Sequence, residues 1–341
     1  MRRRSVPIQR TLIALCSFLA SVVALAQSPA NALAADEKIW EYDRNSIDKL
    51  VAFTAREHTA ILFAVGYATV VYAKDGNVQL IKCDIPEPCK LRAPALSHDG
   101  TTLAYIRDSG AHSGWVVLYN PQTHESRELV RVGDTQLSWS WNDSEIAFRE
   151  CPLRIGAECA IKAVKVKDGS IRTIAALDAY EGKTRKWITS SPLVGSIQWS
   201  HAGRFNLAEV ENEEPTAQSG AYSAYYQTGL VENGVFEKFT TALCPSVSPS
   251  LDRFAYFLGN EVLEEDFDGT QRKLLAETPR SLVLFHESWR CPLVWSPDGK
   301  RLFFGTWVSE NGADKIYLLD TRTRKCKLFL KRTSIRILDW R

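Results

Sequence analysis

A short turn motif recurs along this chain, and it constrains the fold more than any other feature of the sequence. Five copies align on a serine: LSHDGTTLAYI from Leu96, WSWNDSEIAFR from Trp139, WSHAGRFNLAE from Trp199, VSPSLDRFAYF from Val247 and WSPDGKRLFFG from Trp295. The intervals between their serines, Ser97, Ser140, Ser200, Ser248 and Ser296, are 43, 60, 48 and 48 residues. Repeats of about 40 to 50 residues are typical of propeller blades.

Each repeat contains four apolar segments joined by polar turns. One segment ends at the serine turn, a second begins just after it, and the third and fourth are joined by turns such as NPQTHES, KVKDGS, EDFDGT and DTRTRK. Ser, Asp and Asn side chains bond the backbone of a tight turn, and Gly100 and Gly299 tolerate a positive φ there. The sequence therefore predicts an all-β fold: a six-bladed β-propeller of four-stranded blades.

The inner strand of the first blade has two candidates. Trp340 stands where a sixth copy of the motif would place its tryptophan, at the end of the apolar segment 335–340. Residues 50–54 form a second candidate without the tryptophan. We favour closure of the ring by the C-terminal strand, because closure removes exposed sheet edges.

These motifs resemble those of the TolB-like β-propeller family, most directly at WSPDGKRLFF from Trp295 to Phe304. The resemblance covers roughly residues 55–341 and implies a propeller. The resemblance to TolB implies work in the bacterial envelope through protein contacts. TolB has an α/β domain before its propeller, whereas here only residues 27–54 precede the repeats as a lead-in segment, which is too short for that domain.

The first 26 residues have the layout of a cleavable secretory signal. Arginines come first, an apolar run follows from Leu12 to Leu25, and small residues precede cleavage points near Ala26 or Ala34. No later run of uninterrupted apolar residues is long enough to span a membrane. We therefore expect a periplasmic or secreted protein with no transmembrane segment after cleavage. Without the leader the chain has 38 basic and 40 acidic residues, which argues against nucleic acid as a partner.

Because exported proteins enter an oxidising environment, we expect disulfide bonds. Cys83 and Cys89 bracket one short loop, and Cys151 and Cys159 bracket another, so each pair is predicted to close its loop. Cys244, Cys291 and Cys326 are left without an assigned pairing. The spacing of Cys and His shows no pattern typical of a structural zinc site.

Two classes of function remain open, and the first is an enzyme. The chain has no GxSxG elbow of a serine hydrolase. A propeller enzyme, lyase or hydrolase-like, would act on a carbohydrate or peptide at a central pocket with a bound cation held by His112, His286 or the acids Glu209, Glu211, Glu213 and Glu214. We interpret His98 and His201 as solvated turn residues, and Asp266 and Asp268 as part of a hairpin turn. We predict no catalytic residue, metal site or cofactor, with a cation in the central channel as the open alternative.

The second class is a binding scaffold, which we favour. The connections between second and third strands, and those between blades, share one face of a propeller, and they carry the long insertions; we name this the long-loop face. Long loops on a rigid scaffold are where binding usually occurs, and aromatic residues with arginine are enriched at interfaces. We expect a protein or other envelope component to bind there, through Tyr180, Lys183, Arg185, Trp187, Glu211, Glu213, Tyr222, Tyr225 and His286.

Overall fold

The computed structural model describes residues 37–65, 69–81, 90–108, 113–133, 136–150, 160–176, 194–199, 206–215, 222–232, 235–240, 243–250, 252–267, 269–278, 293–309, 312–333 and 335–341. The chain divides into two compact units, Met1–Tyr42 and Asp43–Arg341. Helix α3 (Glu37–Glu57) begins in the first unit and continues into the second. All the described strands belong to the second unit.

Within the described residues the strands form six four-stranded antiparallel sheets. The first three are β24 (Ile335–Trp340), β1 (Ala60–Val65), β2 (Thr69–Lys74) and β3 (Asn77–Ile81); β4 (Lys90–Leu96), β5 (Leu103–Asp108), β6 (Ser113–Tyr119) and β7 (Ser126–Gly133); and β8 (Leu137–Trp139), β9 (Glu145–Glu150), β10 (Ala160–Lys165) and β11 (Ile171–Ala176). The other three are β12 (Val194–Trp199), β13 (Asn206–Pro215), β14 (Tyr222–Glu232) and β15 (Val235–Thr240); β16 (Leu243–Val247), β17 (Arg253–Leu258), β18 (Glu261–Asp266) and β19 (Arg272–Glu277); and β20 (Leu293–Trp295), β21 (Arg301–Ser309), β22 (Gly312–Asp320) and β23 (Lys325–Thr333).

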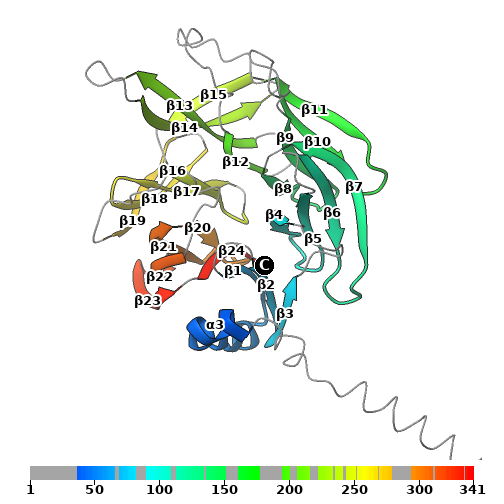
Figure 1. Cartoon of the computed structure of the whole chain (residues 1–341). Helices are drawn as coiled ribbons and strands as arrows, with labels where there is room; N and C mark the ends of the chain where they lie inside the picture. The colour runs from blue at the N-terminus through cyan, green and yellow to red at the C-terminus, as the bar shows by residue number, and fades with distance from the viewer. Residues whose placement is uncertain are drawn as a thin grey trace, which may run out of the picture. The chain divides into compact units, whose positions relative to one another are not determined.

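The first strands of these sheets contact one another in a closed cycle, from β24 through β4, β8, β12, β16 and β20 back to β24. Figure 1 shows the sheets of this unit arranged around the cycle. The predicted all-β propeller of four-stranded blades is therefore confirmed.

The C-terminal strand closes the ring, as predicted. β24 pairs antiparallel with β1, with Ile61 opposite Trp340 and Val65 opposite Ile335. The other candidate, residues 50–54, is wrong as a strand, because these residues lie inside helix α3. Their apolar side chains follow a helical spacing, since Ile47, Leu50 and Phe53 are all buried.

The repeated serine builds the same turn in three blades. Ser97 Oγ donates to Asp99 Oδ1 (2.6 Å) and accepts the Thr102 amide (2.9 Å). Ser140 makes the equivalent bonds to Asn142 and Glu145, and Ser296 to Asp298 and Arg301. These serines are buried, and a buried hydroxyl must be hydrogen-bonded. The motif is therefore a structural turn.

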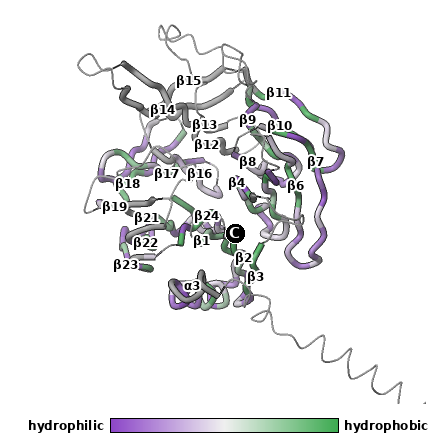
Figure 2. The backbone as a smooth tube through the Cα atoms, viewed as in Figure 1, coloured by the Kyte–Doolittle hydropathy of each residue, from purple (hydrophilic) through white to green (hydrophobic). Residues whose placement is uncertain are grey.

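Apolar side chains fill the space between neighbouring blades. One cluster joins Leu62 and Tyr72 of the first sheet to Leu96 and Tyr105 of the next, and similar clusters follow around the ring. The outermost strands are more polar, as the hydrophilic stretches of β7 show in Figure 2. Because both faces of a blade are covered, strands such as β1 are buried along their whole length.

Helix α3 contacts both the first and the last blade. Phe53 lies edge-on to Phe303 and Phe329 of the last blade and to Trp340 of β24, with ring centroids 5.3–5.4 Å apart. Thr333 Oγ1 donates to Asp43 Oδ1 (2.9 Å), and the Gly76 amide of the β2–β3 turn donates to Thr54 Oγ1 (3.2 Å). The helix therefore bridges the point where the ring closes.

Candidate functional site

Several residues predicted from the sequence lie outside the described residues. They are Tyr180, Lys183, Arg185, Trp187, His286, His112 and His201, and the cysteines Cys83, Cys89, Cys151, Cys159 and Cys291. The two predicted disulfides, and the cation site proposed around His112 and His286, remain predictions. Cys326 is described and is a free, exposed thiol on β23.

The remaining predicted binding residues lie on a paired ribbon, whereas the sequence suggested a loop. Glu211 and Glu213 are on β13, and Tyr222 and Tyr225 are on β14. The register pairs Glu211 with Tyr226, Asn212 with Tyr225, Glu213 with Ala224 and Pro215 with Tyr222. The loop assignment is wrong because the polar, glutamate-rich composition of this segment hid its strand pairing.

This ribbon extends past its own blade. β12 pairs with β13 only up to Val210, and β15 pairs with β14 only from Thr228 onward. Within the described ranges, residues 211–215 and 222–226 therefore pair only with each other; we name them the acidic ribbon. From Phe205 to Glu237, both included, the sequence has six glutamates and no lysine, arginine or histidine. Glu209, Glu211 and Glu213 occupy alternate positions of β13.

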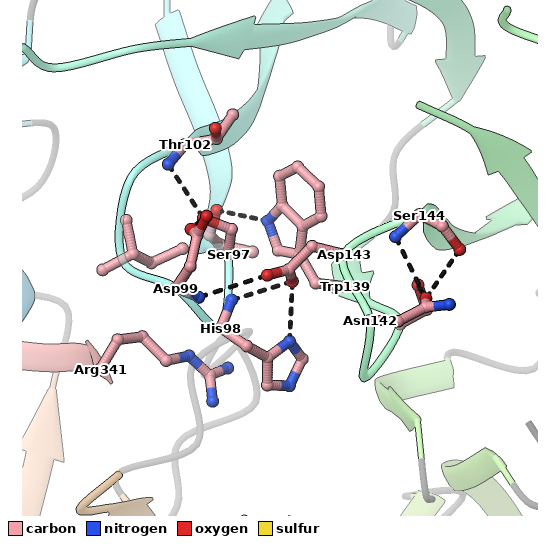
Figure 3. Close-up of polar contacts among 12 residues, drawn as sticks. Ser97, His98, Asp99, Thr102, Trp139, Asn142, Asp143, Ser144 and Arg341 are labelled. Carbon is pink, nitrogen blue, oxygen red and sulfur yellow. Dashed lines mark hydrogen bonds and ion pairs between the residues drawn. The ribbon is translucent and has the colours of Figure 1, made fainter. Parts of the chain in front are cut away.

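A second polar cluster joins two serine turns near the start of the ring. Asp143, in a left-handed conformation with φ of 56°, accepts hydrogen bonds from the His98 amide (2.9 Å) and the Asp99 amide (3.2 Å) of the neighbouring blade. Its Oδ1 also lies 2.8 Å from His98 Nδ1. Figure 3 shows Asp143 joined to the His98 imidazole and to the amides of His98 and Asp99. His98 is a partly exposed turn residue, as predicted, and its ring also bonds across the blade boundary.

The hydrogen bonds of this cluster connect two neighbouring blades. With Asp143 accepting from Nδ1, the neutral imidazole leaves Nε2 as an acceptor. Asp339 makes a comparable contact at the previous boundary, where its Oδ2 accepts the Leu96 amide (3.0 Å) and its Oδ1 lies 3.1 Å from Arg341 Nε. Among the described residues, no three His, Cys, Asp or Glu side chains gather as a metal site would require.

The other described histidines also have turn roles. His124 Nδ1 lies 3.1 Å from Gln79 Nε2 and 2.9 Å from the Tyr119 hydroxyl, so it belongs to the contact between the first two blades. Asp266 closes the hairpin after β18, as predicted, since its carbonyl accepts the Gly269 amide (2.9 Å).

The serine turns also set the ionisation of their aspartates. Burial is the largest influence on Asp99 and raises its pKa, but hydrogen bonds from Ser97 and Thr101 outweigh it and leave the pKa lowered. In the same way, burial raises the pKa of Asp298, and bonds from Ser296 and Lys300 reverse the shift. These aspartates are therefore ionised, turn-forming residues at neutral pH.

Two buried carboxylates on β18 were missed by the sequence analysis. Glu264 and Glu265 are each 5% exposed. Arg253 Nη1 donates to Glu264 Oε1 (2.6 Å), while Arg272 Nε and the Tyr256 hydroxyl donate to Glu265. Burial, and then the bond to Glu265, raise the pKa of Tyr256. The signal was Arg272 standing opposite Glu265 and Lys273 standing opposite Glu264 in the strand register, but the register is visible only once the strands are paired.

Comparison with known proteins supports the fold. No protein-family model matches the sequence, and no curated protein matches it. The crystal structure of TolB from Acinetobacter baumannii superposes with a TM-score of 0.54 at 13% identity, covering 83% of this chain and 66% of that one. A structure from a nidogen/laminin complex gives a TM-score of 0.51 at 9% identity, covering 83% of this chain and 97% of that one. An oligogalacturonate lyase in complex with manganese gives 0.49 at 11% identity, covering 76% and 69%. At such identities the likeness establishes a β-propeller similar to that of TolB, and nothing finer.

Proposed function

We propose that this chain is an exported, non-catalytic propeller that binds a protein or other envelope component through its long-loop face. The observation that carries the proposal is the acidic ribbon, which extends past the four-stranded sheet and holds four of the predicted binding residues: Glu211, Glu213, Tyr222 and Tyr225.

A two-stranded ribbon of this kind contributes little to the stability of the propeller. Isolated hairpins are marginally stable in water, because they bury little apolar surface. Among the described strands, none pairs with either outer edge of the ribbon, and proteins normally cover or shorten such edges. A partner that adds a strand to such an edge gains main-chain hydrogen bonds, and its side chains set the specificity.

The composition of the ribbon indicates the kind of partner. Tyrosine supplies large contact area with few rotatable bonds and is enriched among residues that dominate binding energy. Glutamates without a nearby basic residue in sequence favour a partner surface rich in lysine and arginine, and this charge would speed association. Among the described residues, no helix is long and apolar enough to cross a membrane.

Site-specific photo-crosslinking in the native cells tests the proposal. A benzophenone amino acid is placed at Tyr222 or Tyr225 of the ribbon, and at Thr123, an exposed turn residue between β6 and β7, as the control. We expect an adduct with one partner from the ribbon positions and none from Thr123. Glu211→Lys with Glu213→Lys should abolish the adduct while leaving the melting temperature of the propeller unchanged.

The opposite results are equally clear. Equal crosslinking from Thr123, or no adduct from either ribbon position, would reject the ribbon as the binding element. A stoichiometric metal in the purified protein, together with turnover of a carbohydrate or peptide, would favour the enzyme class instead.

A further inference from the structure

The outer edge of the last blade is strongly basic. Between Thr321 and Leu338 the sequence has seven lysines and arginines and no acid. Every residue from Arg322 to Leu328 is exposed, and so is Lys331. These residues form the β22–β23 turn and the edge strand β23, whose outer side has no strand beside it in its sheet. We name Arg322, Arg324, Lys325, Lys327 and Lys331 the basic edge.

The edge is held in place by ordinary structural contacts. Thr323 bonds Asp320 through its amide (2.7 Å) and hydroxyl (2.8 Å), which fixes the turn. Phe329 and Leu330, which belong to β23, are buried. Lys49 of helix α3 donates to the Phe329 carbonyl. Lys49 is itself exposed, so it adds a further positive charge beside the strand.

The charge of this edge exceeds what protection of an edge strand requires. One or two lysines are enough to discourage edge-to-edge pairing. In blade β8–β11 the outer strand β11 carries a single basic residue, Arg172, and Glu145 neutralises it at 2.7 Å. Among the described residues, the side chains of the basic edge have no such ion pair. Asp320 stands opposite Lys325 in the strand register and accepts two hydrogen bonds from Thr323.

One apolar side chain of the edge strand is exposed and stands among these cations in the sequence. Leu328 is 43% exposed, between Lys327 and Lys331 in sequence, and the exposed Cys326 stands two residues before it. A soluble polyanion offers charge only, whereas a lipid bilayer offers phosphates above an apolar layer. Long lysine side chains beside an inserted leucine suit the second arrangement.

We propose that the basic edge is a peripheral docking site for a bilayer surface rich in anionic phospholipids. Clusters of four to eight lysines and arginines are the usual size of such sites, and each one strengthens binding by about fivefold. The site is on a different blade from the acidic ribbon, so membrane docking and partner binding would use separate surfaces.

Vesicle co-sedimentation of the whole mature protein tests this site. The probes are vesicles of phosphatidylcholine alone and of phosphatidylcholine with phosphatidylglycerol. We expect binding only to the second kind, weakening as salt shortens the range of electrostatic attraction. Lys325→Gln with Lys327→Gln should weaken binding about 25-fold. The matched control is Lys165→Gln with Lys167→Gln in the exposed β10–β11 turn, which should change it less than twofold.

Leu328→Ser separates a bilayer from a soluble polyanion. It should weaken vesicle binding about fivefold, because the inserted apolar surface is lost, and leave the affinity for soluble polyphosphate unchanged. The proposal is overturned if both vesicle types bind equally, if neither binds, if the control pair matters as much as the edge pair, or if Leu328→Ser has no effect on vesicles. The photo-crosslink from Tyr225 reports contact with a partner, and the vesicle assay uses the purified protein without a partner, so either proposal can fail while the other stands.

Discussion

Two boundaries between blades are held by different kinds of residue. Between sheets β4–β7 and β8–β11, Trp139 Nε1 donates to the Ala95 carbonyl (3.0 Å) and Asp143 clamps His98. Where β24 closes the first blade, Trp340 Nε1 instead donates to Thr59 Oγ1 (2.9 Å) beside β1 of the same blade, and Phe53 of helix α3 packs against Trp340 and against Phe303 of the last blade. The first boundary uses residues of the repeat, and the second uses residues from both ends of the propeller unit.

The difference follows from what each boundary must do. An ordinary boundary joins blades that are already linked along the chain, so the repeat can supply its contacts. The closing seam joins segments nearly 300 residues apart, and its formation must offset a larger loss of chain entropy. The added helix face and the aromatic cluster of Phe53, Phe303, Phe329 and Trp340 supply extra buried surface there.

The largest expected effect comes from removing residues 335–341. Without β24 the first sheet loses its inner strand, and Ile61 to Val65 lose their partners in the sheet. We expect the cooperative thermal transition to disappear, measured by calorimetry. A synthetic peptide of these seven residues, added in trans, should restore a transition that depends on peptide concentration. A normal transition in the truncated protein would mean that the seam contributes little.

Phe53→Ala should have the next largest effect on stability. The side chain is 1% exposed and contacts three aromatic rings, so we expect unfolding to become easier by about 4 kcal/mol. Phe257→Ala, at the boundary between β16–β19 and β20–β23, is the matched control because Phe257 is also buried and packs near Phe304. Chemical denaturation measures both. A loss below about 1 kcal/mol for Phe53 alone would show that the helix is not part of the seam.

Substitution of the tryptophans at the blade boundaries should have a smaller effect on the free energy of unfolding. Trp139→Phe and Trp295→Phe each remove an indole donor from the carbonyl of the preceding blade, Ala95 or Ser246. We expect each to lower the free energy of unfolding by about 1–2 kcal/mol. Trp340→Phe removes a bond to Thr59, whose hydroxyl keeps a contact with the Arg341 carbonyl. Its cost should therefore be lower, and equal costs at all three positions would remove this distinction between the boundaries.

The sequence predicted the parts of the fold that repeat. The serine turns, the four strands of each blade and the closing role of Trp340 were visible because the same residue types return at similar intervals. Helix α3 was missed. Its apolar residues form a helical face that is not repeated elsewhere in the sequence. The propeller repeat led to the interpretation of residues 50–54 as a candidate strand.

The candidate sites were less predictable for a related reason. The glutamates and tyrosines of the acidic ribbon were recognised by residue type, but a polar, glutamate-rich segment gave no alternation from which to infer strand pairing. His98 was found and its partner was not, because Asp143 is 45 residues away on another blade and the contact depends on how two turns meet. Glu264 and Glu265 required knowledge of the cross-strand register.

The smallest expected effect tests whether the repeated turn works by charge or by shape. Asp298 has a lowered pKa in the folded protein, so its contribution to stability is present above the pKa of the unfolded chain, about 3.9, and is lost as pH falls through the folded value. Asp298→Asn should cost about 0.5 kcal/mol at pH 7 and nothing at pH 2, since Asn142 makes the same turn in the third blade. The reciprocal Asn142→Asp should add pH dependence of the opposite sense, with stability rising relative to wild type above pH 4. Denaturant midpoints from pH 2 to 7 measure both, and a cost for Asp298→Asn that is equal at every pH would mean that the turn depends on shape alone.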